Sequence, residues 1–377
     1  MSLIKWPGGK SKEFTYIEKA IPAFDRYIEP FFGGGAIFFK IKPSNALIND
    51  KSVDLMDFYR LIQQNSSEFK RYLYLYNYCW DSLMDLIKGN SNVLLSIYHR
   101  HSNEKNDSFL SDELTSFLQN IKPELKQLLP EEIIIDYPGL FKEISRTSLD
   151  KFIRTQENEL KLQEQLSVQD LQDNILTGYM SGLYMHFRNL YNIIHLDSYG
   201  NTIPITLEHK IANFYFIREF CYGSMFRYNS NGEFNIPYGG ISYNSKNFKL
   251  KIEKIFHQET LELFKNTQIY SDDFETFLDK IQLTSTDFIF LDPPYDTDFS
   301  SYEGNEFNEN DQVRLANTLA KIPAKFILII KKTDFILSLY KDLSRIHIVD
   351  FDKQYAYNVR SRNNRDTNHL IISNFPV

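Results

Sequence analysis

The most distinctive chemical feature of the sequence is a segment in which a carboxylate, two prolines and a tyrosine are consecutive, Asp292-Pro293-Pro294-Tyr295. It directly follows the apolar run at residues 288–291, which is typical of a strand buried on both faces of a parallel sheet. Ligands of such sheets bind beyond the carboxyl ends of the strands, so Asp292 is predicted to face a binding cleft. The prolines fix φ and lack N–H groups, which lets backbone carbonyls point into that cleft.

These groups together form an acceptor array that suits a planar amino-aromatic substrate. The amino group would donate its two hydrogens to the Asp292 carboxylate and to a backbone carbonyl, while the ring stacks on Tyr295. An ordinary turn at the end of a strand explains the same residues, because Pro-Pro dipeptides mark turns in general. The segment by itself leaves both interpretations open.

A second candidate site is the glycine cluster at residues 31–36, FFGGGA, which follows a short strand-like run and precedes a predicted helix start. Glycines here allow a tight turn and a close approach of a ligand to the backbone, although the spacing is not that of the dinucleotide pattern. Asp50 ends the next apolar run, near the roughly 20-residue offset at which an acid binds ribose hydroxyls. A helix N-cap is an alternative role for Asp50, and the two roles are compatible.

The pattern of apolar and polar residues along the chain predicts the secondary-structure elements that position these residues. Short apolar runs alternate with turns and helix-like stretches in the first 50 residues and again after residue 248, which predicts an α/β domain. Amphipathic stretches between residues 53 and 171 predict helices, and a Ser-Asn-Gly turn predicts a β-hairpin at 227–243. A strand pair is expected around 351–359 and 369–375. The predicted domains are 1–60 together with 248–377, and an inserted domain at 61–247.

Composition limits the class of protein. A length of 377 residues is typical of two domains, and 42% hydrophobic with 24% charged residues indicates a globular protein, neither disordered nor fibrous. No apolar run is long enough to span a bilayer and no signal peptide is recognisable, so we expect a cytoplasmic protein without a membrane partner. The two cysteines, Cys79 and Cys221, are too few for a disulfide framework or a four-cysteine metal site, and no metal is expected.

Three of these features occur in the order found in the α group of bacterial DNA adenine amino-methyltransferases: the N-terminal KWPGGK (residues 5–10), the glycine cluster and the Asp-Pro-Pro-Tyr segment. The sequence strongly resembles the Dam-type DNA adenine methylases. The hairpin, the segment Ser271-Asp272-Asp273-Phe274 and the stretch 357–365 followed by HLIISN add to the match. The resemblance covers roughly the first 60 and the last 160 residues.

The resemblance implies a fold, a cofactor and a set of site residues. The fold is an α/β class I S-adenosylmethionine-dependent methyltransferase fold, Rossmann-like, with a mostly parallel sheet, helices on both faces and an inserted target-recognition domain made of helices and the hairpin. The residues implied to bind S-adenosylmethionine are Trp6, Lys10, Phe31, Gly33, Gly35, Asp50, Asp273 and Phe274. The implied catalytic residues are Asp292, Pro293, Pro294 and Tyr295, and DNA contact falls on Lys5, Arg227, Tyr228, Asn229, Asn235 and Tyr238. Simpler roles remain for Trp6 and Phe274 as core residues and for the lysines as solvated side chains.

The implied activity is transfer of a methyl group from S-adenosylmethionine to the N6 amino group of an adenine flipped out of duplex DNA. This amino nitrogen is a poor nucleophile because its lone pair is delocalised, and hydrogen bonds to the Asp292 carboxylate and the Pro293 carbonyl would localise that pair. The reaction needs no metal or thiol, and the base must leave the duplex to reach a pocket. The setting implied is restriction-modification, with a cognate endonuclease acting separately, or a phage or orphan methylase.

Charge must be reconciled with DNA binding, because the net charge is −7. Phosphate contact requires a local positive excess. In residues 217–251, five cations outnumber two acids; they are Arg218, Arg227, Lys246, Lys249 and Lys251 against Glu219 and Glu233. From residue 351 onward four cations likewise outnumber two acids. Both segments are therefore expected to face DNA.

Alternatives remain at this stage. An amino-methyltransferase acting on RNA or cytosine would keep the same cofactor, and a catalytically silent DNA-binding module would keep the same fold. The stretch between Asp50 and Arg227 is longer than in a compact Dam-type enzyme. It would enlarge the recognition domain, bind a partner or buttress the fold. The recognition sequence and the oligomeric state are left open.

Overall fold

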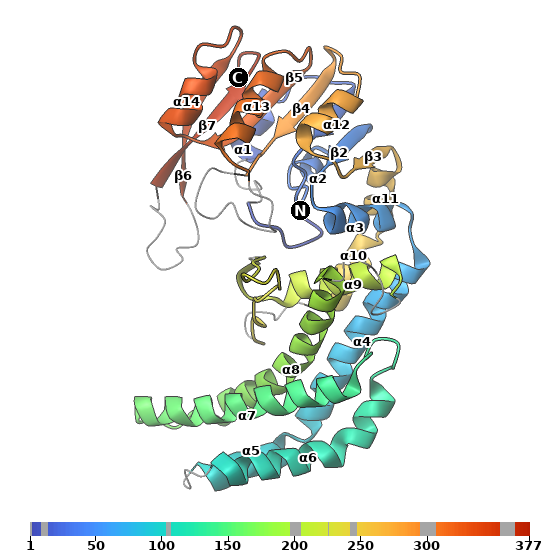
Figure 1. The fold of residues 1–377 in the computed structure, drawn as a ribbon, viewed down its shortest axis with the longest axis vertical. Coiled ribbons are helices and arrows are strands. Elements are labelled where there is room, and N and C mark those ends of the chain that lie inside the picture. Colours follow the sequence, from blue (N-terminus) through green and yellow to red (C-terminus); the bar gives the residue numbers. More distant parts are fainter. Residues whose placement is uncertain are drawn as a thin grey trace. The chain divides into compact units, whose positions relative to one another are not determined.

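The computed structural model describes residues 2–8, 14–102, 107–196, 205–224, 226–241, 247–294, 307–354 and 366–377. The chain forms two compact units, which are described separately (Figure 1). The sheet unit comprises Met1–Asn65 and Lys254–Val377, and the helical unit comprises Ser66–Glu253. These boundaries lie a few residues from those predicted, and the assignment of domains stays a prediction. None of the helices in the described ranges is both long and apolar enough to cross a membrane.

The sheet unit contains a seven-stranded sheet in the order β3-β2-β1-β4-β5-β7-β6. The strands are β1 (Arg26–Glu29), β2 (Ala46–Asn49), β3 (Thr267–Tyr270), β4 (Asp287–Leu291), β5 (Lys325–Lys331), β6 (His347–Gln354) and β7 (Asp366–Ser373). β7 pairs antiparallel with both β5 and β6, while β1 to β5 form a parallel array. Because β1 lies between β2 and β4, the direction of the chain through the sheet reverses at β1.

Helices cover both faces of this sheet, as expected. One face packs against α12 (Phe274–Lys280), α13 (Glu309–Leu319) and α14 (Asp334–Tyr340), which share a core with the apolar side chains of the central strands. Tyr27 of β1 points the other way, and its ring lies 6.3 Å from that of Phe38. That ring belongs to α2 (Phe38–Ile41), which with α3 (Val53–Gln63) and α11 (Gln258–Lys265) contributes a cluster of aromatic rings. The opposite orientations follow from the two-residue period of a strand.

Two short helices of the sheet unit precede the first strand, α1 (Phe14–Ile17) and the 3₁₀ helix η1 (Glu18–Ala20). The helical unit consists of α4 (Ser67–Gly89), α5 (Ser91–His101), α6 (Asp107–Leu128), α7 (Tyr137–Leu162), α8 (Val168–Leu196), α9 (Leu207–Phe220) and the 3₁₀ helix η2 (Tyr222–Ser224). α10 (Phe248–Ile255) spans the boundary between the units. The helices predicted between residues 53 and 171 are confirmed, and α8 and α9 add helical structure beyond residue 171.

Close packing of α7 against α8 depends on small residues. A Cβ atom added to Gly182 of α8 would lie 2.4 Å from the Ile144 Cα of α7, so only glycine allows the backbones to approach this closely. One turn earlier, the Gly178 carbonyl accepts a hydrogen bond of 2.8 Å from the Thr147 hydroxyl. α9 is buried along almost its whole length and forms the centre of the unit.

The predicted β-hairpin is present as antiparallel pairing without extended strands. Isolated bridges join Tyr228 to Phe234 and Cys221 to Tyr238. The turn is closed by the Gly232 N–H, which donates to the Asn229 carbonyl at 3.0 Å. Gly232 has φ +79°, a conformation that favours glycine. Residues 226–241 are referred to below as the hairpin.

Candidate active site

Four acidic residues lie at the carboxyl ends of four neighbouring parallel strands. Glu29 ends β1, Asp50 follows β2, Asp273 follows β3 and Asp292 follows β4. Parallel strands end at the same edge of the sheet, so these positions share one edge. The strand order reverses at β1, and open α/β sheets bind their ligands beyond the strand ends beside such a point. Of the predicted site residues, Asp50, Asp273 and Asp292 therefore lie along this edge.

The glycine cluster is held in place through both polar atoms of Gly33. Its N–H donates to Asp50 Oδ2 at 2.8 Å, and its carbonyl accepts from the Tyr59 hydroxyl at 3.1 Å. Gly33 has φ +50°, and an added Cβ would lie 2.8 Å from Trp6 Cδ1. Gly35 has φ +63°, and its Cβ would collide with the Phe32 ring. Positive φ and close neighbours therefore favour glycine at both positions, and the structure brings Trp6, Gly33 and Asp50 together.

Asp50 organises the loops that follow β1 and β2. Its Oδ1 accepts a 3.0 Å hydrogen bond from the Ser52 N–H, so each carboxylate oxygen binds one backbone amide. Burial raises the pKa of Asp50 above its ordinary value, and these two amides lower it in part. The N-cap of α3 is Ser52, so the alternative assignment of Asp50 as a helix N-cap is wrong.

Asn49, the residue before Asp50, ties three loops of this edge together. Its amide nitrogen donates to the Pro30 and Asp272 carbonyls, each at 3.0 Å, and its Oδ1 accepts from the Asp272 N–H at 2.9 Å. The loops after β1, β2 and β3 are thus connected by one buried side chain. The apolar pattern of β2 did not reveal this role, because an asparagine at a strand end has many uses.

Glu29 is a site residue that sequence reasoning missed. Its side chain is only 2% exposed and accepts a 2.8 Å hydrogen bond from the Tyr27 hydroxyl. Burial raises the pKa of Glu29 well above its usual range, and the nearby Asp292 and Asp50 carboxylates raise it further. A carboxylate that directly ends an apolar strand before a glycine cluster was the available signal. Tyr59 was also missed, and no local pattern links it to Gly33.

The predicted segment Ser271-Asp272-Asp273-Phe274 lies at the start of α12. Asp273 Oδ1 accepts from the Glu275 N–H at 3.1 Å and from Arg314 Nη2 at 2.6 Å. The Arg314 guanidinium also lies 4.9 Å from the centre of the Phe274 ring. This ring is 4% exposed and lies 5.4 Å from the ring of Phe31, so Phe274 is largely a packing residue. Arg314, on α13, is a further residue that the sequence did not indicate.

The Asp-Pro-Pro segment leaves β4 as expected. Asp292 is half-buried, Pro293 is buried and Pro294 is exposed. The Pro294 carbonyl accepts a 3.3 Å hydrogen bond from Gln312 Nε2 of α13, which anchors the segment. Tyr295, Lys10 and the predicted motif at 357–365 lie outside the described residues. Lys5 lies in the N-terminal segment beside Trp6 and is half-buried.

The predicted DNA-contacting residues of the hairpin have different surroundings. Arg227 is exposed, and its Nε donates to Asn235 Oδ1 at 3.3 Å. The Tyr228 hydroxyl is 2.8 Å from that of Tyr191 on α8. Asn229 Oδ1 accepts two backbone N–H groups within the turn, and the Tyr238 ring packs 5.3 Å from Trp80. Asn229 and Tyr238 therefore support the hairpin itself.

Some of the charged residues counted near the hairpin are buried or paired. Arg218 is 1% exposed and lies over the Phe226 ring at 4.1 Å. Lys251 forms an ion pair with Glu219. Of the five cations counted in this stretch, Arg227 and Lys249 are exposed, and Lys246 lies outside the described residues. Contact of this segment with DNA therefore stays a prediction, with Arg227 and Lys249 as the exposed cations of its described part.

The fold and the site together define a class of protein. A mostly parallel seven-stranded sheet with this order, helices on both faces and the site at the carboxyl ends of β1 to β4 constitute the class I S-adenosylmethionine-dependent methyltransferase fold. The sequence matches the family described as D12 class N6 adenine-specific DNA methyltransferase over residues 6–78 and 110–356. The chain belongs to this family.

Individual relatives agree with this assignment. The Type II methyltransferase M.CviBI of Paramecium bursaria Chlorella virus NC1A is 25% identical over 379 residues, which cover 99% of both chains. The Type II methyltransferase M.MjaIII of Methanocaldococcus jannaschii is 25% identical over 85% of this chain and 79% of its own. The DNA N-6-adenine-methyltransferase of Escherichia phage P1 is 24% identical over 84% of this chain and 28% of its own. The prediction of an adenine-specific DNA methyltransferase is confirmed.

Proposed function

We propose that S-adenosylmethionine binds along the carboxyl ends of β1, β2 and β3, and that the target adenine, flipped out of duplex DNA, is held beyond β4 by Asp292 and Pro293. The observation that carries this proposal is the joint arrangement of Gly33 and Asp50 beside the point where strand order reverses. In this arrangement the groups proposed to bind the cofactor would adjoin the Asp-Pro-Pro segment.

The residues of this edge fit the proposed cofactor. Gly33 and Gly35 present backbone without a side chain, so the methionine end of the cofactor can approach closely. Each Asp50 oxygen binds one amide and retains lone-pair capacity for a ribose hydroxyl. Among the described residues the hydrogen bonds to Asp273 fall on Oδ1. Oδ2 would therefore accept a hydrogen bond from the amino group of the cofactor adenine. Trp6 borders the glycine cluster, and Lys10 is proposed to contact the methionine end of the cofactor.

The rings around Asp273 complete this subsite. Phe31 is partly buried and contacts Phe274, so its remaining surface would lie against the cofactor adenine while Phe274 supports it. Arg314 would hold the Asp273 carboxylate in one orientation through its 2.6 Å contact. When bound, S-adenosylmethionine supplies the electrophilic methyl group of a sulfonium.

The residues after β4 would prepare the nucleophile. The Asp292 carboxylate and the Pro293 carbonyl would accept the two N6 hydrogens, which favours a pyramidal nitrogen and directs its lone pair outward. The same carboxylate stabilises the positive charge that develops on this nitrogen. The Gln312 contact to the Pro294 carbonyl would keep the segment rigid. Tyr295 would stack on the flipped base, since stacking holds an extruded base in place.

For DNA contact we propose that the hairpin presents Arg227, with Asn235 and Tyr228 beside it and with Asn229 and Tyr238 as its internal supports. Lys5 would contact the DNA backbone. We further propose a restriction-modification setting, in which a separate endonuclease reads the same site, because relatives of this length carry type II methyltransferase names.

The test is methyl transfer from tritiated S-adenosylmethionine to unmethylated duplex DNA, followed by nucleoside analysis. The wild type should yield N6-methyladenine. Asp292→Ala should reduce transfer at least 100-fold and leave the dissociation constant for S-adenosylmethionine unchanged, because this carboxylate is assigned to the substrate amine alone. Label in cytosine or only in RNA, or near-wild-type activity of Asp292→Ala, would overturn the proposal.

A further inference from the structure

One face of α8 contacts both arms of the hairpin. Five side chains of this helix contact it, and their spacing of three or four residues places them along a single stripe. They are Tyr184, Arg188, Tyr191, Asn192 and His195. Their partners lie on both arms of the hairpin, so the stripe holds it at several points.

Asn192 makes the most specific of these contacts. Its Nδ2 donates to the Phe234 carbonyl at 3.1 Å, and its Oδ1 accepts from the Phe234 N–H at 2.8 Å. The amide therefore pairs with both polar backbone groups of one residue, as a neighbouring strand would. The next residue, Asn235, binds Arg227 across the hairpin. The contact thus sets the position of the arm next to the exposed arginine.

The other contacts fix the two arms around this point. On the first arm, Tyr228 shares a 2.8 Å hydroxyl hydrogen bond with Tyr191, and the His195 ring stacks on it with 5.1 Å between ring centres. On the second arm, the Ile236 carbonyl accepts from the Tyr184 hydroxyl at 3.0 Å. Arg188 reaches the same carbonyl at 3.4 Å.

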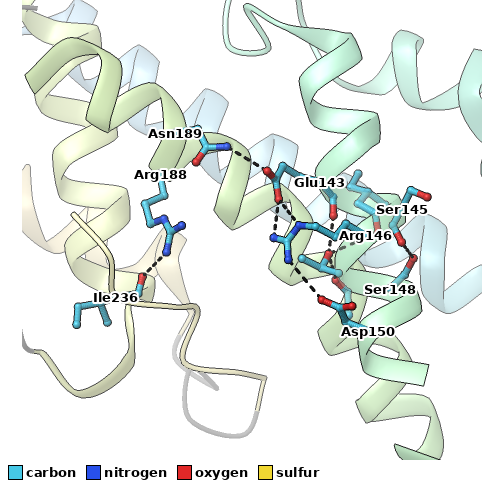
Figure 2. A network of polar contacts seen from close by, with 11 residues as sticks. Glu143, Ser145, Arg146, Ser148, Asp150, Arg188, Asn189 and Ile236 are labelled. Atoms are coloured by element: carbon cyan, nitrogen blue, oxygen red, sulfur yellow. Dashed lines mark hydrogen bonds and ion pairs between the residues drawn. The ribbon is translucent and has the colours of Figure 1, made fainter. Parts of the chain in front are cut away.

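The adjoining side of α8 is bound to α7. Figure 2 shows Arg188 directed toward Ile236 of the hairpin, whereas the adjacent Asn189 is directed toward Glu143 of α7. The Asn189 amide donates to Glu143 Oε1 at 3.3 Å. Together with the close contact at Gly182, this bond makes α7 a rigid support for α8.

We infer that α8 positions the hairpin for target recognition, and that Asn192 is a positioning residue for sequence discrimination. The inference rests on the proposed contact between the hairpin and DNA. The inserted helices would then have a specific role, which is to hold the recognition hairpin in position. Asn192 touches no base itself and acts by holding Phe234 and, through it, the arm that carries Asn235.

Asn189 is a matched control, because it is an asparagine on the same helix whose amide binds α7. The recognition site is first mapped as methylated adenines in DNA from cells that express the wild type. The kcat/KM is then measured on duplexes with this site and with one base pair of it changed. Asn192→Ala should lower the discrimination ratio about tenfold, since two hydrogen bonds are lost, with an unchanged Kd for S-adenosylmethionine. Asn189→Ala should keep the wild-type ratio.

Asn192→Asp provides a rescue test, because it keeps the acceptor for the Phe234 N–H and loses the donor. Its ratio should lie between those of the wild type and Asn192→Ala. If Asn192→Ala and Asn189→Ala lower the melting temperature equally and neither changes the ratio, Asn192 is only structural and the inference is overturned.

Arg227→Ala separates this inference from the proposed function. If it alters neither DNA affinity nor discrimination, the hairpin does not contact DNA, and the proposed DNA interface fails. If Arg227→Ala changes discrimination and Asn192→Ala does not, the positioning role of α8 fails alone.

Discussion

Replacement of Asp50 by alanine tests the centre of the proposed cofactor site. The change removes the acceptor of two backbone N–H groups, those of Gly33 and Ser52. An unsatisfied buried amide costs about 1–3 kcal/mol, although the Ser52 N–H can be hydrated at the start of α3 and should cost less. Removal of the partly desolvated carboxylate, whose pKa is raised by burial, offsets part of this loss. The net loss of stability should be about 1–3 kcal/mol.

Cofactor binding should suffer more than folding. Loss of hydrogen bonds between ribose hydroxyls and a charged carboxylate costs about 1.5–3 kcal/mol, so the Kd for S-adenosylmethionine should rise roughly 10- to 100-fold. Release of the Gly33 N–H would loosen the glycine cluster and add to this effect. The Kd of the Asp50→Asn variant should lie between those of the wild type and Asp50→Ala. The asparagine amide retains one acceptor oxygen but presents an NH₂ group to one of the two backbone donors.

Titration calorimetry with S-adenosylmethionine and thermal unfolding without it separate the two effects. Asp57→Ala is the matched control, because Asp57 lies on α3 nearby and forms a largely buried pair with Arg60. It should lower stability by about 1–2 kcal/mol and leave the Kd unaltered. An Asp50→Ala protein that binds the cofactor as tightly as the wild type would refute the reasoning, whatever its melting temperature.

Two further predictions concern pH. Because burial raises the pKa of Glu29, the folded state keeps this proton at pH values where the unfolded chain has lost it, and stability falls as pH rises toward the folded pKa. Glutamine at position 29 cannot titrate. The Glu29→Gln variant should therefore have a higher melting temperature than the wild type at pH 8 and the same melting temperature at pH 4. Equal melting temperatures at pH 8 would contradict this. Burial lowers the pKa of His186 and His209 to about 4, so the helical unit should lose stability as pH falls from about 6.5 to about 4, by about 3 kcal/mol per histidine. His209→Phe, which retains a ring beside Tyr72, should show a shallower decline in urea unfolding between pH 7 and pH 5.

The sequence was sufficient to predict the features that depend on residues close together in the chain. Apolar runs located β1, β2 and β4, because a buried strand needs a continuous apolar stretch. The glycine cluster was recognisable because positive φ and close neighbouring side chains together favour glycine, as at Gly33 and Gly35. The order of motifs was enough to indicate the family and its chemistry.

Only the tertiary structure decided which distant residues complete the site. Tyr59 reaches Gly33, and Arg314 reaches Asp273, across separations in the chain that no period of 2 or 3.6 residues records. The same holds for Asn192, whose amide completes the backbone pairing of Phe234 in the hairpin. Local patterns report the conformation and burial of one segment at a time. The partner of a buried polar group is determined by how helices and strands pack, and that packing is a property of the whole chain.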